Sequence, residues 1–171
     1  MNRRRAGTLA LALTLALPSA CHDPPRPAEP AQEISMDDSL RQLDQHPRLA
    51  VSIRQGTEHF RDGVVTVTIR GDGLVVVDRL RAGTPSRVEQ RLPPERIRDL
   101  GRALAEHRVT AARTSKLPRE PGDTPLVLRV DGGARPFQAE VWYGDRYQDR
   151  DLDALIRLAD ALVTEVAPPA R

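Results

Sequence analysis

The chain has 171 residues, of which 39% are hydrophobic and 29% charged, and it contains a single cysteine. Its formal net charge is +2, but the first 21 residues hold three arginines and no acid, so the rest of the chain carries −1. A chain so close to neutrality lacks the basic surface that attracts nucleic acid or anionic lipid, and with no second cysteine it forms no internal disulfide bond.

The N-terminal segment has the layout of a secretory signal. Three arginines at positions 3–5 precede a 12-residue apolar stretch, residues 6–17. That stretch is shorter than the ~20 residues of a membrane-spanning helix. The small residues Ser19 and Ala20, which a signal peptidase accepts, come directly before Cys21.

The stretch LALPSACH, residues 15–22, resembles the lipobox of bacterial lipoproteins, with Pro18 where that family usually has leucine. The resemblance implies a lipoprotein signal peptide over residues 1–20 and acylation of Cys21 by palmitate-type chains. It also implies a place in the bacterial cell envelope. Asp23 is third in the mature chain rather than second, so the inner-membrane retention signal is missing and the outer membrane is the expected location. The alternative is an ordinary secretory signal that leaves Cys21 as a free thiol.

Behind the signal, the sequence predicts a tether over residues 21–48, a single domain over 49–167 and a C-terminal tail over 168–171. Four prolines between positions 24 and 30 favour extended chain. Within the tether, the spacing in MDDSLRQLD, residues 36–44, indicates one or two helical turns with Asp37 as the N-cap. The domain of about 120 residues is large enough for one core only.

Strands and helices of the domain follow from the hydrophobic periodicity. Strands are expected over residues 49–55, 64–70, 74–81, 86–92, 125–133 and 135–144, and helices over 93–107 and 151–166, with a long polar loop over 113–125. The glycines in GDG, residues 71–73, join strand to strand, which indicates a hairpin turn rather than a phosphate-binding loop. Gly101, on the apolar face of the first helix, indicates a close approach to the sheet. The order strands, helix, strands, helix predicts an α+β fold: an antiparallel sheet of about five or six strands with two helices on one face.

Several of these segments resemble known families. The GDG turn, the LPPE helix start at residues 92–95, the strand DTPLVL at residues 123–128 and the closing leucine-rich helix occur in an order similar to two groups. One is a set of small bacterial lipoprotein domains of unknown function. The other is the emfourin-like family, whose members inhibit thermolysin-type metalloproteases. The similarity covers roughly residues 60–165 and transfers no inhibitory residue.

Residues suited to catalysis or metal binding are scattered. His22 and His46 fall in the tether, His59 falls near a loop, and His107 ends a helix, where an imidazolium is favourable. No pair of histidines has the spacing of zinc ligands, so no metal or cofactor is expected. An acidic cluster within GDRYQDRDLD, residues 144–153, is interrupted by arginines, which favours helix capping over calcium binding.

Aromatic residues gather between positions 137 and 147, and strand alternation turns Trp142 to the face opposite the core. We therefore expect Trp142, Arg146 and Tyr147 to form an interaction surface, because outward tryptophans often anchor interfaces. The alternative places Trp142 beneath the 145–150 loop or the tether.

These features predict a lipid-anchored envelope lipoprotein whose domain binds a ligand without catalysing a reaction. Its expected partners are the bilayer, through Cys21, and an envelope protein or a secreted protease. One alternative is an emfourin-like protease inhibitor. A second is an envelope enzyme, which would need His59 or an acidic pair in a cleft.

Overall fold

The structure is a computed structural model that describes residues 34–168 except 60–62, 117, 119–121 and 134. The signal peptide, Cys21 and most of the expected tether lie outside the described residues. The helices are α1 (Met36–Arg41), α2 (Pro94–Glu106) and α3 (Arg150–Val166), with short 3-10 helices η1 (Leu43–Gln45), η2 (Val109–Ala111) and η3 (Tyr143–Tyr147). The strands are β1 (Ala50–Gly56), β2 (Val64–Arg70), β3 (Leu74–Arg81), β4 (Thr84–Arg91), β5 (Pro125–Asp131) and β6 (Phe137–Trp142).

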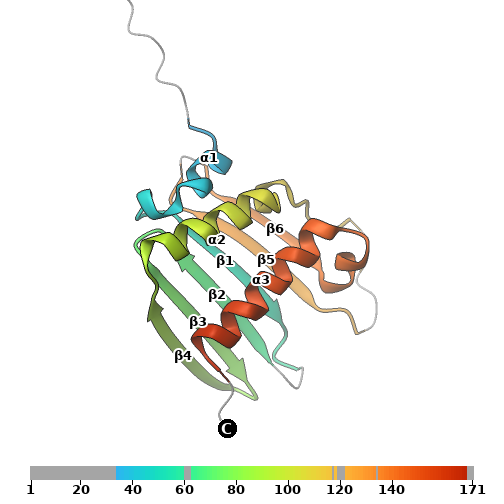
Figure 1. Cartoon of the computed structure of the whole chain (residues 1–171). Coiled ribbons are helices and arrows are strands. Elements are labelled where there is room, and N and C mark those ends of the chain that lie inside the picture. Colours follow the sequence, from blue (N-terminus) through green and yellow to red (C-terminus); the bar gives the residue numbers. More distant parts are fainter. Residues whose placement is uncertain (1–33, 60–62, 117, 119–121, 134, 169–171) are drawn as a thin grey trace, which may run out of the picture. The chain divides into compact units, whose positions relative to one another are not determined.

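The six strands form one antiparallel sheet in the order β4-β3-β2-β1-β5-β6, so β4 and β6 are its edges. Both long helices, α2 and α3, lie across the same face of this sheet (Figure 1). The α+β fold predicted from the sequence is therefore confirmed.

Alternation along the strands builds the core. Val51 and Ile53 of β1 stand beside Ile69 and Val67 of β2, and all four are at most 1% exposed. They face α2 and α3, whose apolar stripes complete one continuous core. Each fully buried side chain of this size contributes about 1.5–3 kcal/mol, so this face of the sheet supplies most of the stability.

The long helices begin where local chemistry allows. Pro94 is the first residue of α2, where its missing N–H leaves no hydrogen bond unmade. The carboxylate of Asp149 caps α3, accepting hydrogen bonds from the backbone N–H groups of Asp151 (2.9 Å) and Leu152 (3.1 Å). The prediction that the acidic cluster within residues 144–153 serves to cap a helix is confirmed at Asp149.

The folded domain begins earlier than the sequence predicts. Ser35, not Asp37, caps α1, its hydroxyl accepting a hydrogen bond from the Asp38 N–H at 3.1 Å. Leu40 and Leu43, which were expected in the tether, are fully buried in the core. The compact unit starts at Glu33, so a boundary at residue 49 is wrong. All the core side chains lie within this unit, which therefore carries its own core.

The N-terminal segment, residues 34–48, packs closely against two glycines of the domain. A Cβ atom on Gly101 would lie 2.1 Å from the carbonyl oxygen of Leu40. A Cβ atom on Gly71 would lie equally close, 2.1 Å, to the carbonyl oxygen of His46. The close approach predicted at Gly101 exists, but its partner is α1 rather than the sheet.

The turn between β3 and β4 also differs from expectation. The strands expected over 74–81 and 86–92 leave four residues between them, yet Arg81 pairs with Thr84, so only Ala82 and Gly83 form the loop. Both have positive φ, 49° and 76°, as a type I′ hairpin turn requires. Alanine is strained in this conformation, which costs roughly 1 kcal/mol relative to glycine.

None of the helices in the described part of the chain is long and apolar enough to cross a membrane.

Candidate binding cleft

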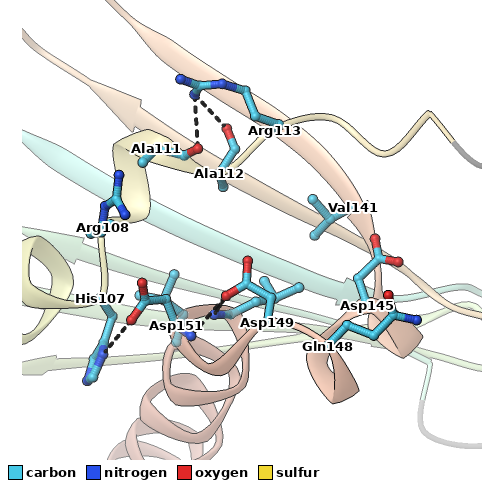
Figure 2. Close-up of a pocket in the computed structure, with 12 residues that line it drawn as sticks. His107, Arg108, Ala111, Ala112, Arg113, Val141, Asp145, Gln148, Asp149 and Asp151 are labelled. Atoms are coloured by element: carbon cyan, nitrogen blue, oxygen red, sulfur yellow. Dashed lines mark hydrogen bonds and ion pairs between the residues drawn. The ribbon is translucent and has the colours of Figure 1, made fainter.

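A cleft of about 370 Å³ opens where the end of α2, η2 and the start of α3 meet beside strand β6. Its floor is apolar and includes Val141 of β6 and Leu152 and Leu155 of α3. Charged side chains stand around this floor on two walls (Figure 2). Such a floor with a polar rim is the usual make-up of a ligand site.

The first wall is the C-terminal end of α2. His107 is the C-cap residue, and Arg108 follows it in the left-handed conformation, with φ of 49°. Helices commonly end in this way, but glycine usually occupies the left-handed position because any Cβ is strained there. Arginine at this position therefore gives the domain a lower free energy of unfolding than glycine would.

The second wall is acidic. Asp145, Asp149 and Asp151 come from η3 and the start of α3. Asp145 accepts a hydrogen bond from the Trp142 N–H at 3.1 Å, and the Asp151 carboxylate lies 3.6 Å from Nδ1 of His107. The pairing of His107 with Asp151 joins the two walls, as Figure 2 shows.

The arginines of the cleft differ in how they are bonded. Arg113 donates hydrogen bonds to the carbonyl oxygens of Ala111 (2.9 Å) and Ala112 (3.3 Å). The side chain of Arg108 has no hydrogen bond or ion pair to any of the residues that the structure describes. Its guanidinium is exposed and carries five donors toward solvent at the cleft mouth.

The interaction surface expected from the sequence is only partly assembled. Trp142 does share the outer sheet face with Glu140, but it is half-buried and makes contacts of its own. Tyr147 is 84% exposed, as expected for a residue that could meet a partner. Arg146 is not available in the same way, because its side chain is only 14% exposed.

Arg146 holds η3 to α3. Its guanidinium hydrogen-bonds the Tyr143 hydroxyl, lies 4.8 Å from the centroid of that ring, and donates to the Asp153 carboxylate at 2.6 Å. The hydrogen bond from Arg146, aided by Arg157, holds the pKa of Asp153 below its usual value. These contacts give Arg146 a structural role, which replaces the interface role expected for it.

The histidines within the described residues do not converge, and His22 lies outside those residues. His59 is exposed and lies outside the cleft, so the histidine that lines the cleft is His107. Among the described residues, no group of three or more histidines, cysteines or acids is arranged to hold a metal ion.

Sequence reasoning placed His107 correctly at a helix end but did not single out Arg108. One signal was present, since the helix over residues 93–107 runs into His-Arg-Val with no glycine or asparagine to end it. Hydrophobic periodicity alone could not show that this helix end would form a wall of the cleft.

No model of a known protein family matches this chain, and no curated protein matches it either.

Proposed function

We propose that this protein is a lipid-anchored lipoprotein of the bacterial cell envelope, whose domain binds a protein partner without catalysing a reaction. The lipidated residue is Cys21, and the binding site is the cleft beside Arg108. The anchor and the cleft rest on different observations and are tested separately.

The anchor is supported by the sequence around Cys21. An apolar segment, two small residues and the only cysteine of the chain occur in the order that lipoprotein processing requires. Since the domain begins near Ser35, 13 residues separate it from Cys21. Those residues reach at most about 45 Å when fully extended. The domain is thus held near the bilayer, in reach of other envelope proteins.

Replacing the cysteine should abolish lipidation. In cells fed a labelled fatty acid, the wild-type chain should take up label and Cys21→Ser should take up none, because the thiol is the acylation site. Two or three acyl chains give a lasting anchor, whereas one gives only marginal binding. Asp23→Asn, which leaves the thiol in place, should be labelled like the wild type. An unlabelled wild-type chain would indicate the ordinary secretory signal instead.

The binding role is carried by Arg108. The Arg108 backbone is held in the left-handed conformation, and its exposed side chain bonds to none of the residues that the structure describes, so it contributes nothing evident to the fold. Strained residues of this kind cluster at functional sites. The acidic wall opposite disfavours a small, purely anionic ligand. A polypeptide segment that carries both an acidic and a basic side chain matches both walls, with its apolar groups over the cleft floor.

Substituting glycine should separate binding from stability. Arg108→Gly should raise the free energy of unfolding by roughly 0.5–1 kcal/mol, because the strain is relieved, and should lower the yield of partners captured from an envelope extract. Ala82→Gly is the matched control, since Ala82 has the same φ of 49° in a turn outside the cleft. It should bring a similar gain in stability with unchanged capture. If Arg108→Gly captured every partner as well as the wild type, the cleft would not be the binding site.

A second candidate is inhibition of thermolysin-type metalloproteases. The observation that favours it is the order of elements from the GDG turn onward, on which the emfourin resemblance rests: strands, a helix, a long loop, two strands and a closing helix. The purified domain should then slow a thermolysin-type protease at a stoichiometric ratio. Full protease activity in the presence of micromolar domain would remove this candidate.

A further inference from the structure

The edge strand β4 has an unusual surface. All eight of its residues are exposed, and no other strand lies beyond it in the part of the chain that the structure describes. Figure 1 shows β4 at one side of the sheet. An open strand edge offers a row of backbone donors and acceptors to a further strand.

The register identifies which backbone groups face outward. Arg81 and Thr84 flank the two-residue turn, and the Leu92 N–H donates to the Gly73 carbonyl at 2.9 Å. The even-numbered residues from 84 to 92 therefore bond to β3. The N–H and C=O groups of Arg87, Glu89 and Arg91 point away from the sheet. Pro85, which has no N–H to offer, occupies another of these outward positions.

The side chains of β4 are complementary to those of the same strand turned around. We propose that a second copy of this chain pairs its β4 with this one, antiparallel about a two-fold axis at Val88. Arg87 then lies opposite Glu89 of the second copy, and Glu89 lies opposite Arg87, giving two cross-strand ion pairs on one face. Val88, which is 38% exposed, meets its own counterpart on the other face. The two sheets become one of twelve strands. This inference does not depend on the proposed function.

Neighbouring registers are unfavourable. An axis at residue 87 sets Arg87 against Arg87, and an axis at residue 89 sets Glu89 against Glu89, and like charges directly opposite destabilise a sheet. An axis at residue 90 pairs Glu89 with Arg91 but brings residue 87 opposite Pro93, which has no N–H and precedes α2. Only the axis at Val88 pairs the whole strand with opposite charges opposed.

Within one chain, Arg87 already lies 2.6 Å from Glu89 and 3.4 Å from Asp78. These contacts orient both side chains on the outer face and leave oxygen and nitrogen atoms for a second partner. The charges also protect the edge against apolar strands, which would take these ions out of water without offering them a new partner. The edge is therefore selective for its own copy.

Single charge reversals test the pairing. We use the chain from Glu33 to Arg171, which carries its own core, and measure its association by sedimentation velocity up to about 1 mM, where an association with a dissociation constant of that size is readily seen. Arg87→Glu and Glu89→Arg should each weaken self-association roughly tenfold or more, because two attractive pairs become repulsive. Mixing the two variants should restore a dimer, since each then supplies the opposite charges. Arg129→Glu, on strand β5 between β1 and β6, should associate like the wild type.

Amide hydrogen exchange supplies a second readout. The N–H groups of Arg87, Glu89 and Arg91 should exchange fast in dilute solution and slowly at high concentration, while that of Val88, bonded to β3, stays slow throughout. A wild-type chain that sediments as a monomer at every concentration would overturn the proposal. So would a dimer that both reversals leave intact, or one whose outward amides show no added protection.

Discussion

Gly101→Ala should lower the free energy of unfolding by about 2 kcal/mol or more. In an exposed helix this substitution would add about 1 kcal/mol of stability, because alanine is the better helix former. Here the new methyl group would lie 2.1 Å from the Leu40 carbonyl oxygen and 2.7 Å from the Leu43 Cβ. The N-terminal segment must move away, and overpacking of this kind costs about 1–3 kcal/mol. Denaturant unfolding followed by circular dichroism measures the difference.

The sign of the change makes the result informative. Arg102→Ala, on the exposed side of the same helix, should alter stability by less than about 0.5 kcal/mol. A stabilising effect of Gly101→Ala would show that α1 does not pack on Gly101.

Removing residues 33–48 should largely unfold the domain. Leu40 and Leu43 are both fully buried, and losing two such side chains removes about 3–6 kcal/mol. The Asp44 carboxylate, which accepts hydrogen bonds from Arg98 at 2.7 and 3.1 Å, is lost as well. Because small domains are stable by only about 5–15 kcal/mol, little would remain. The loss should appear as a collapsed near-ultraviolet circular dichroism signal and a lower unfolding midpoint.

The control is a chain that begins at Glu33, which should be as stable as one that begins at His22. Equal stability of the chains from Glu33 and from Leu49 would restore the domain boundary that the sequence predicts.

Much of the fold could be predicted from local pattern. The alternation in β2 and β3 and the apolar stripes of α2 and α3 each fix one face of an element, and these elements appear close to their expected bounds. The N-terminal segment was missed because its partners are distant in the sequence. The hairpin turn explains Gly71, yet this glycine also approaches a backbone carbonyl of that segment, as Gly132 does. A sequence shows that such a glycine suits a local turn, but it does not show that the same glycine also makes room for a distant segment.

The candidate site was less predictable. Trp142 was placed on the correct face, because strand register follows from alternation. The sequence could not show that Arg146 is held in internal contacts rather than exposed. Its contacts with Tyr143 and Asp153 depend on how η3 folds back on α3. Arg108 was overlooked because helix periodicity says nothing of the residue after the last turn. The pairing pattern of β4 is visible only once its outward backbone groups are known.

The most direct test of the account is mass spectrometry of the mature N-terminus, on protein purified from native membranes. We expect a chain that begins at Cys21, with its sulfur linked to a diacylglyceryl group. A chain released into the medium, whose N-terminus bears an unmodified thiol, would contradict the account.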